Sequence, residues 1–507
     1  MRNPTWRRAL PLLVGSIACL ALVVAWFAHT PSGAKADATD QGEPSGLSYT
    51  FIGNSETPPT EAECASAIPS ARRCFTPQAI QAAYNVGPLY AQGYTGKGMT
   101  IAIVDSYGSD TIAHDLHVFD QAFGLQPMCG EEGVTCAAGM PNFSVLHVQG
   151  SPSTTAPPSQ SNGTGQEDRA GWALEVSLDV EMAHAIAPQA NILLVATPTA
   201  ETLGVQGFPQ MMNAEQYVID HHLANVISQS FASAEDAFAS TQSLQNLRHA
   251  FISAAQNGVT VLGSSGDGGS ANGKKTPVGQ GGSTIPYPTV EWPASDPLVT
   301  GVGGTYLCTN PTANTNDPRV YAFGIPARCK LGQAEVGWIA SGGGFSHVFS
   351  KPDYQNALPA GSTSIGSMRG VPDVAFQASA LTGALVYVSL PPDGLSGVSC
   401  PNGQPCSTGW YVIGGTSLAC PQFAGLVAIA DQINGGGLGL INPALYKIGA
   451  DPTRYANDFY DITTGNNTAD PSVPGYPATT GWDPVTGLGT PNAANLVPDL
   501  VQAAHGH

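Results

Sequence analysis

The chain has few charged side chains, and positively charged ones are scarcest. Of its 507 residues, 18 are Lys or Arg and 37 are Asp or Glu, which gives a formal net charge of −19 at pH 7. This balance argues against nucleic acid as a partner, because phosphate backbones are bound by clusters of basic residues. A surface with so few basic groups gains little positive charge when its carboxylates are protonated. The composition is therefore compatible with activity in acid, although an ordinary acidic secreted protein would share it.

A mostly apolar run at residues 9–28 follows Arg2, Arg7 and Arg8 and precedes small residues at positions 34, 36 and 38. This order predicts a signal peptide over residues 1–38. We therefore expect a secreted protein without membrane attachment after cleavage. The run also approaches the length of a spanning helix, and an uncleaved N-terminal anchor is the alternative.

The rest of the chain divides into two parts, residues 39–73 and residues 74–507. Residues 39–73 are rich in Gly, Ser, Pro, Thr and Glu and lack a sustained period, which predicts a flexible linker or a short pro-region. Residues 74–507 contain no second linker and no internal repeat. Amphipathic stretches there alternate with short apolar runs, at residues 100–104, 190–195, 225–228 and 259–262. The alternation predicts one large α/β domain with a parallel central sheet flanked by helices, and catalytic groups beyond the C-terminal ends of the strands.

The cysteine spacings lack histidines placed for zinc. One of the ten cysteines, Cys19, lies in the predicted signal. Eight others are close neighbours in pairs, which predicts local disulfides in an oxidising compartment: Cys64 with Cys74, Cys129 with Cys136, Cys308 with Cys329, and Cys400 with Cys406. Cys420 is left over in an apolar run and is predicted to be a buried thiol.

Residues 414–421 read G-G-T-S-L-A-C-P and precede an apolar run at 423–430. Glycines before a serine that opens a helix permit a sharp turn and leave the Ser417 hydroxyl beside the free amides of the first turn. Pro421 is expected in that first turn, where its missing N–H has no consequence. The local pattern fits a nucleophile and a serine cap on a buried helix equally well.

Glu175 and Asp179 stand four residues apart in the segment W-A-L-E-V-S-L-D, so both carboxylates project from one face of a helix. Like charges at this spacing repel, and a shared proton would relieve the repulsion and raise an apparent pKa. On spacing alone, two solvated surface acids are the simpler interpretation. The histidines are scattered singly, and no H-G-T-H segment is present.

Asp267 follows a predicted strand in the segment V-L-G-S-S-G-D-G-G. A side chain in such a loop can approach a nucleophile with little steric hindrance from its neighbours. Aspartate is also common in ordinary turns, and the loop alone does not separate the two interpretations.

These three segments resemble the motifs of the sedolisins, serine-carboxyl peptidases with a subtilisin-like fold. G-T-S-x-A-x-P resembles the nucleophile motif that subtilisins and sedolisins share, E-x-x-x-D running on to A-I-A-P resembles the sedolisin acid motif, and S-S-G-D-x-G resembles the oxyanion motif. The resemblance implies that Ser417 is the nucleophile and Glu175 its general base. It also implies that Asp179 supports the base and that a protonated Asp267 belongs to the oxyanion hole. Further matches lie at residues 76–84, 292–295, 302–305, 341–346 and 369–373.

Two C-terminal segments, Y-D-I-T-T-G at 460–465 and G-W-D-P-V-T-G at 481–487, resemble the sedolisin calcium site. The resemblance implies one structural Ca²⁺, bound by the side chains of Asp461 and Asp483 and by the carbonyls of Ile462, Thr479 and Gly481. Carboxylate and carbonyl oxygens are the ligands that this cation takes. Two turn aspartates are the alternative.

Three features depart from the sedolisin pattern. Family members usually carry a folded pro-segment of domain size, for which residues 39–73 are too short. The strand that often ends in S-W-G reads S-Q-S-F-A at residues 228–232, without the tryptophan. Asp105, at the end of the first predicted strand, stands where some members hold an auxiliary acid, and it either extends the carboxylate network or caps a turn.

The sequence thus predicts a secreted, monomeric serine-carboxyl endopeptidase that hydrolyses peptide bonds in proteins and peptides at acidic pH. One alternative is a histidine-dependent subtilisin-like protease, against which the missing histidine motif argues. Another is an inactive secreted binding protein that keeps the same fold.

Overall fold

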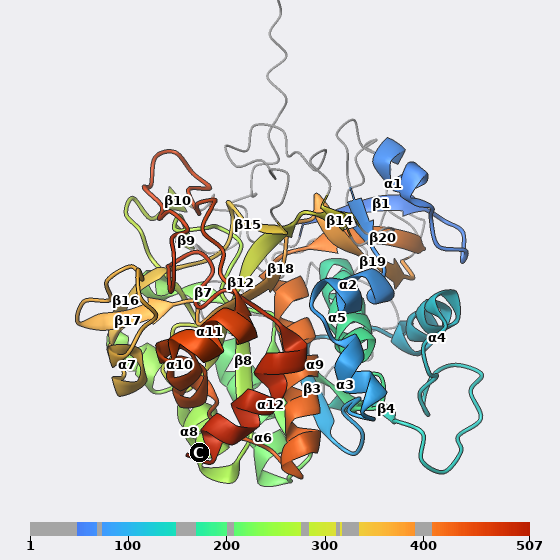
Figure 1. Cartoon of the computed structure of the whole chain (residues 1–507). Coiled ribbons are helices and arrows are strands. Elements are labelled where there is room, and N and C mark those ends of the chain that lie inside the picture. The colour runs from blue at the N-terminus through green and yellow to red at the C-terminus, as the bar shows by residue number, and fades with distance from the viewer. Residues whose placement is uncertain are drawn as a thin grey trace, which may run out of the picture. The chain divides into compact units, whose positions relative to one another are not determined.

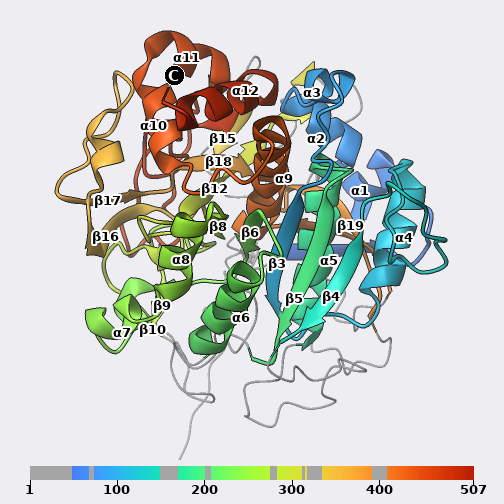
Figure 2. The same cartoon turned by 90° about the horizontal axis from the view of Figure 1, so that it is seen from below.

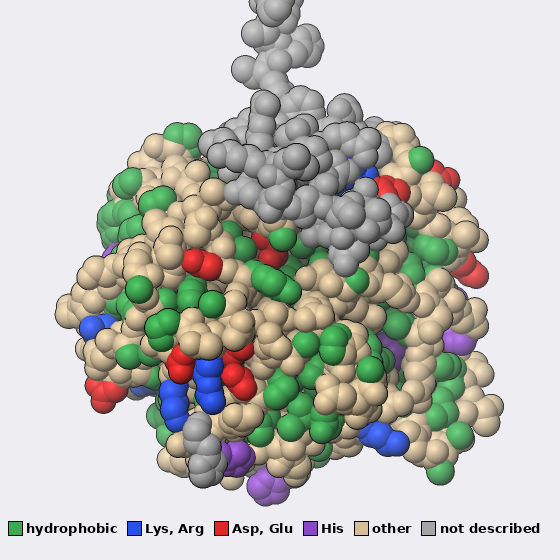
Figure 3. All heavy atoms as spheres, in the orientation of Figure 1, with side chains coloured by type: hydrophobic (Ala, Val, Ile, Leu, Met, Phe, Trp, Pro, Cys, Tyr) green, Lys and Arg blue, Asp and Glu red, His purple; other side chains and the backbone are tan. Residues whose placement is uncertain are grey.

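The computed structural model of the chain describes residues 48–67, 73–148, 169–199, 207–274, 283–310, 315–316, 334–390 and 408–506. The predicted signal peptide and the first part of the predicted linker lie outside these residues. In the described part, no helix is both long enough and apolar enough to cross a bilayer. Charged side chains are sparse on the face drawn in Figure 3, as the composition predicts.

A central sheet of eight strands organises the fold (Figure 1). Its order is β15-β12-β8-β6-β3-β5-β4, and β18 also pairs with β12. Every pairing is parallel except that of β15 with β12. The strands are β3 (Thr100–Ser106), β4 (Phe143–His147), β5 (Asn191–Thr197), β6 (Val226–Gln229), β8 (Thr260–Ser264), β12 (Thr300–Leu307), β15 (Glu335–Gly337) and β18 (Val374–Gln377). The predicted parallel sheet is confirmed. The four predicted apolar runs form β3, β5, β6 and β8, which are adjacent in the sheet.

Helices cover both faces of this sheet (Figure 2). Because successive side chains of a strand point to opposite faces, Ile101 and Ile103 join the core that contains α5 and α9. Ala102 and Val104 join the core that contains α6 and α8. Burial on both faces is what a parallel sheet requires. The helices are α5 (Arg169–Ile186), α6 (Phe208–Asp220), α8 (His249–Asn257) and α9 (Thr416–Asn434).

Helix α9 is buried at every position from 416 to 431, and it packs along α5 and against β6, β8 and β12. Pro421 lies inside α9, so its predicted place in the first turn is wrong. A proline in a helix interior has no N–H for the carbonyl four residues earlier, which here is the carbonyl of Ser417.

A second sheet has the order β1-β20-β19-β2. Its members are β1 (Ser48–Gly53), β2 (Arg73–Phe75), β19 (Thr382–Val388) and β20 (Gly409–Gly414). Strand β20 runs directly into α9. Within residues 39–73, predicted as a flexible linker or short pro-region, the structure describes β1 and the helix α1 (Glu61–Ala67).

Two predicted disulfides are confirmed, Cys64–Cys74 and Cys129–Cys136. Cys308 is also disulfide-bonded, but its predicted partner Cys329 lies outside the described residues, as do Cys400 and Cys406. Cys420 is a buried free thiol, as predicted.

The remaining described elements surround these layers. They are α2 (Pro77–Ala83), α3 (Gly87–Ala91), α4 (Ile112–Phe123), α7 (Thr241–Gln245), α10 (Asn442–Ala450), α11 (Pro452–Asp458), α12 (Ala493–Ala504), the 3₁₀ turns η1 (Glu235–Ala237) and η2 (Asp353–Asn356), and the short strands β7 (Ser233–Ala234), β9 (Gly273–Lys274), β10 (Ser283–Thr284), β11 (Glu291–Trp292), β13 (Thr309–Asn310), β14 (Thr315–Asn316), β16 (Gly344–Ser350), β17 (Met368–Val371), β21 (Phe459–Tyr460) and β22 (Thr490–Pro491).

Candidate active site

The segment that holds Ser417 begins where β20 ends and α9 starts. Gly415 has a φ of 126°, which residues with a side chain rarely adopt. A Cβ at this position would lie 2.7 Å from Oδ2 of Asp267, so glycine permits both the turn and the close approach of that acid. Ser417 follows in the first turn of α9, where N–H groups have no acceptor within the helix, and it is 2% exposed.

Helix α5 brings Glu175 and Asp179 to this segment because it packs along α9. Both residues are fully buried, so their interpretation as solvated surface acids is wrong. The Ser417 hydroxyl lies within hydrogen-bonding reach of Glu175 and lowers the pKa of that carboxyl. No hydrogen bond of good geometry reaches either Glu175 oxygen from the described residues. Catalytic hydrogen bonds are often loose before substrate binds.

Burial dominates the protonation of the two acids. It raises the pKa of Glu175 well above its ordinary value, and the charges of Asp105 and Asp267 raise it further. Burial also raises the pKa of Asp179, followed by the charges of Asp105 and Glu175. Asp105, in β3, is itself fully buried. The charge of Asp105 thus acts on both acids, and carboxyl groups that raise one another's pKa do not all ionise together.

Ser230 was not predicted as a site residue. It directly follows β6 and is fully buried. It lies within hydrogen-bonding reach of Glu175 and Asp179 and lowers the pKa of each. The signal for it in the sequence is the segment S-Q-S-F-A at residues 228–232, whose second serine is Ser230. The absence of a tryptophan there draws attention away from that serine. Phe231 stands in place of that tryptophan and packs in the core against Phe208, with ring centroids 5.9 Å apart.

Asp267 is held by the first residue of α9. Its Oδ1 accepts hydrogen bonds from the Thr416 N–H (2.6 Å) and the Thr416 hydroxyl (2.9 Å). The same hydroxyl accepts the Gly266 N–H at 3.0 Å. Within the described residues, Oδ2 has no hydrogen-bond partner. Burial raises the pKa of Asp267 to about 7, although the bonds from Thr416 lower it. A proton on Asp267 therefore belongs on Oδ2, because Oδ1 is already an acceptor.

The site thus combines three chemical groups from three elements. Helix α9 supplies a hydroxyl, α5 a carboxylate pair, and the loop after β8 an acid that is neutral below about pH 7. A hydroxyl beside a carboxylate can become a nucleophile. A neutral acid can donate a hydrogen bond to developing negative charge. The set is suited to acyl transfer.

The five residues predicted to bind calcium gather around one loop. The Gly481 N–H donates to both oxygens of Asp461, at 3.1 and 3.2 Å, and the Thr479 N–H donates to Oδ2 of Asp483 at 2.9 Å. Burial raises the pKa of Asp483 to about 7, against hydrogen bonds from neighbouring N–H groups. Asp483 is fully buried and Asp461 is half-buried. A dication would supply positive charge to these two carboxylates, and an all-oxygen donor set suits Ca²⁺.

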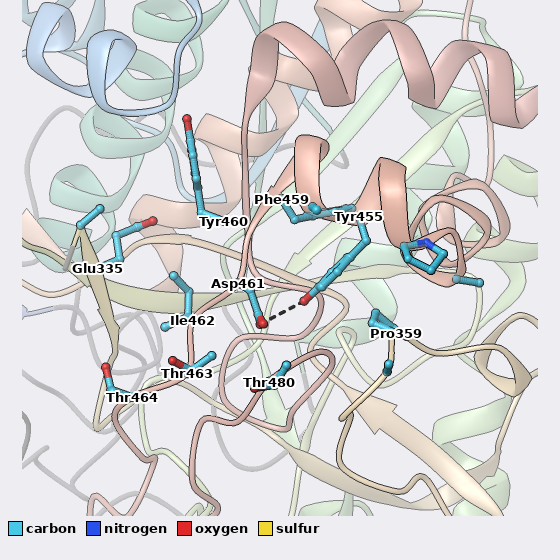
Figure 4. A pocket seen from close by; sticks show the side chains of 16 residues that line it. Glu335, Pro359, Tyr455, Phe459, Tyr460, Asp461, Ile462, Thr463, Thr464 and Thr480 are labelled. Atoms are coloured by element: carbon cyan, nitrogen blue, oxygen red, sulfur yellow. Dashed lines mark hydrogen bonds between the residues drawn. The ribbon is translucent and has the colours of Figure 1, made fainter. Parts of the chain in front are cut away.

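This donor set depends on backbone carbonyls as well as carboxylates. In the described part of the chain, no cluster of three or more His, Cys, Asp and Glu side chains is placed to bind a metal. A cavity of about 630 Å³ borders Asp461, and Figure 4 shows the aromatic residues that line it. The Tyr455 hydroxyl donates to Oδ1 of Asp461 at 3.0 Å.

The R-G-V-P-D segment is structural. Arg369 and Asp373 form a fully buried ion pair at 2.6 Å. Asp373 also accepts the Gly301 N–H from β12 at 2.8 Å and the Tyr446 hydroxyl from α10 at 2.9 Å. This network ties β12 to α10 and to the residue that directly precedes β18.

Comparisons with known proteins agree with this architecture. The family model described as the subtilase family matches residues 96–440. The chain is 31% identical over 449 residues to kumamolisin from Bacillus sp. (strain MN-32), and the match covers 88% of this chain and 66% of kumamolisin. It is 32% identical over 353 residues to sedolisin from Pseudomonas sp. (strain 101), covering 68% of this chain and 52% of sedolisin. The chain belongs to the subtilase family, as a sedolisin.

A solved structure confirms the subtilisin-like fold of this sedolisin. It is Pseudomonas sedolisin, described as a serine-carboxyl proteinase, complexed with two molecules of pseudo-iodotyrostatin. The alignment has a TM-score of 0.59 at 26% identity and covers 84% of this chain and 98% of that chain. Tripeptidyl-peptidase 1 from Homo sapiens is 29% identical over 358 residues, covering 66% of this chain and 53% of that protein. The chain spans about half to two thirds of the full length of kumamolisin, of the sedolisin precursor sequence and of tripeptidyl-peptidase 1 that it matches.

Proposed function

We propose that this sedolisin is a secreted serine-carboxyl endopeptidase that hydrolyses peptide bonds in proteins and peptides at acidic pH. The observation that carries the proposal is the meeting of Ser417, Glu175 and Asp267 in one buried site. A surface cap, a surface acid pair and a turn aspartate would have no reason to converge. The intact set also argues against an inactive binding protein on the same fold.

In the proposed reaction, Oγ of Ser417 attacks the carbonyl carbon of the peptide bond while Glu175 takes the hydroxyl proton. Asp179 shares the charge that develops on Glu175. Asp267 and the Ser417 N–H donate hydrogen bonds to the oxyanion of the tetrahedral intermediate. The C–N bond then breaks as Glu175 returns the proton to the departing amine. Water, deprotonated by Glu175, then attacks the carbonyl carbon of the acyl-enzyme. The bond from that carbon to Oγ of Ser417 breaks, Glu175 returns the proton to Oγ, and the carboxylic acid product leaves.

The restriction to acid follows from two opposing requirements. Glu175 must be ionised to accept a proton, which sets the acid limb of the pH profile. Asp267 must be protonated to donate to the oxyanion, and its pKa of about 7 sets the alkaline limb. Above that pH the site would place an anion against a developing anion, so turnover should fall while the fold persists.

A digestion experiment tests the proposal. A denatured protein is incubated with the wild type, Ser417→Ala and the exposed-site control Ser472→Ala between pH 2 and 8, and new termini are identified by mass spectrometry. We expect internal cleavage in acid by the wild type and the control, and none by Ser417→Ala. Undiminished cleavage by Ser417→Ala, or a plateau above pH 7, would refute the serine-carboxyl mechanism.

The same assay separates an endopeptidase from a tripeptidyl-peptidase, the activity named for one relative. Peptides with an acetylated N-terminus remain substrates for an endopeptidase, because cleavage within the chain does not require a free amine. Release of tripeptides from free N-termini, with acetylated peptides left intact, would assign the exopeptidase activity instead.

Two further properties belong to the proposal. We expect one Ca²⁺ at the loop of Asp461 and Asp483, serving stability more than chemistry. We also expect export through residues 1–38, with N-terminal sequencing of the protein from culture medium as the direct measurement.

A further inference from the structure

The N-terminal segment holds both edges of the sheet that leads to Ser417. Strand β1 pairs antiparallel with β20, with Ser48 opposite Gly414 and Gly53 opposite Trp410. Strand β2 pairs with β19 at the other edge. Figure 1 shows β1 and α1 beside β20 and β19. Because β20 passes directly into the glycine turn before Ser417, its position sets where the nucleophile segment starts.

Side chains reinforce the β1–β20 pairing. The Phe51 and Tyr411 ring centroids lie 5.1 Å apart, and those of Tyr49 and Tyr411 lie 6.4 Å apart, both edge-on. The indole N–H of Trp410 donates to the carbonyl of Glu56 at 3.2 Å. Tyr411 is fully buried and Trp410 is 1% exposed. Without β1, strand β20 would present unpaired backbone groups and aromatic side chains at a sheet edge.

The segment is also tied covalently. The disulfide Cys64–Cys74 joins α1 to β2, and Glu61 forms an ion pair with Arg73. A peptide-bond cleavage between residues 67 and 73 would leave residues 48–67 attached through this disulfide. Cleavage of the chain in this region would therefore not by itself release residues 48–67 from the enzyme.

We propose that residues 48–67 stay in the active enzyme as a disulfide-tethered clasp that positions the nucleophile segment. The proposal rests on the function proposed above, in which Ser417 is the nucleophile. The clasp fixes β20 up to Gly414, three residues before Ser417. A nucleophile displaced by about 1 Å can lose about 10² in rate, so the pairing acts on turnover more than on substrate binding.

The first test is the intact mass of active protein purified from culture medium, before and after reduction with a thiol. We expect residues 48–67 in the unreduced protein. If the chain is cleaved between Cys64 and Cys74, the N-terminal fragment should separate only after reduction. Active protein that lacks residues 48–67 before reduction would overturn the proposal. The intact mass can be measured on the purified protein whether or not it cleaves peptides, so the retention of residues 48–67 is decided separately from the proposed function.

The second test compares two double variants, Cys64→Ser with Cys74→Ser and, as matched control, Cys129→Ser with Cys136→Ser. We expect kcat of the first to fall about 10- to 100-fold with little change in KM, and the control to keep wild-type kcat. If the disulfide only stabilises the fold, its removal should lower the melting temperature without a specific fall in kcat at unchanged KM.

A third variant tests the same role without removing the disulfide, in case the cysteine variants misfold. Tyr49→Ala with Phe51→Ala keeps the disulfide and removes both ring contacts to Tyr411. We expect kcat to fall as in the Cys64 and Cys74 double variant, and the unreduced mass to show that residues 48–67 are still attached. Wild-type kcat in this variant, or in the Cys64 and Cys74 double variant, would overturn the positioning role.

Discussion

At the scale of single residues, the oxyanion acid is the group whose chemistry depends most on its neighbours. Oδ1 of Asp267 is occupied by two donors from Thr416. The carboxyl group is therefore oriented before substrate arrives, and its proton has one oxygen left to occupy. Preorganised donors of this kind are worth more than donors that must turn during the reaction.

Two substitutions of Asp267 should distinguish the effect of losing the hydrogen-bond donor from the effect of a donor that no longer titrates. In Asp267→Ala the donor is lost, and we expect kcat to fall about 10²- to 10³-fold at every pH. In Asp267→Asn the amide oxygen can accept from Thr416 while the amide nitrogen donates at any pH. The alkaline limb near pH 7 should therefore move upward in the profile of kcat/KM. An unchanged alkaline limb in Asp267→Asn would show that another group sets it; the exposed Asp353→Asn is the control.

Ser230 should affect the opposite limb. Its hydroxyl lowers the pKa of Glu175 and of Asp179, so its removal should raise both. We expect Ser230→Ala to shift the acid limb of kcat/KM to higher pH and to leave the alkaline limb in place. Ser230→Thr, which keeps a hydroxyl, should restore the wild-type limb if it folds. An acid limb unchanged in Ser230→Ala would remove Ser230 from the site.

The site was only partly predictable at this scale. Glu175 and Asp179 could be found because their segment resembles the sedolisin acid motif, whereas their spacing alone favoured two surface acids. Ser230 and Thr416 could not be assigned, because a serine after a strand and a threonine beside the nucleophile have no distinctive local pattern. Their roles arise from contacts with residues far away in the sequence.

At the scale of elements, the loop between Thr479 and Asp483 is the segment that the proposed Ca²⁺ would stabilise. Its N–H groups donate to the carboxylates of the half-buried Asp461 and the fully buried Asp483, and bound Ca²⁺ would neutralise them. A ligand that binds only the folded state stabilises it by about 2.7 kcal/mol at 100 times its Kd. We expect a chelator to lower the melting temperature of the wild type, and to have no further effect on Asp483→Asn. Equal melting temperatures with calcium and with chelator, together with no calcium by elemental analysis, would contradict the site.

The elements also differ in how far the sequence predicted them. The central strands were predicted because each is a short apolar run buried on both faces. Strand β1 was missed because its segment S-Y-T-F-I-G lies in a region rich in Gly, Ser and Pro. Its strand structure depends on pairing with β20, which no local pattern can indicate.

At the scale of the whole molecule, buried acids should make the fold most stable in acid. Burial raises the pKa of Asp115 to about 6 and that of Asp431 to about 8, and it raises that of Glu215 well above its ordinary value. An acid with a raised pKa binds its proton more tightly in the folded state, so the free energy of unfolding falls as pH rises from about 4 through the raised pKa. For Asp115 the effect is on the order of 3 kcal/mol.

Thermal unfolding followed by calorimetry between pH 3 and 8 checks this expectation. The melting temperature should be highest near pH 4 and should decline toward pH 8. Glu215→Gln should flatten the decline, because Glu215 has no hydrogen-bond partner among the described residues and glutamine does not titrate. A melting temperature that rises toward neutral pH would contradict the expected direction.

The clasp also has a consequence for biosynthesis. Glu56 and Trp410, which it joins, stand 354 residues apart. At a synthesis rate of about 5–20 residues per second, the N-terminal strand waits roughly 20–70 s for its partner. Ser417 emerges later still than that partner. A chain that is still being synthesised therefore cannot assemble the proposed catalytic centre, because the nucleophile segment is among the last parts to be made.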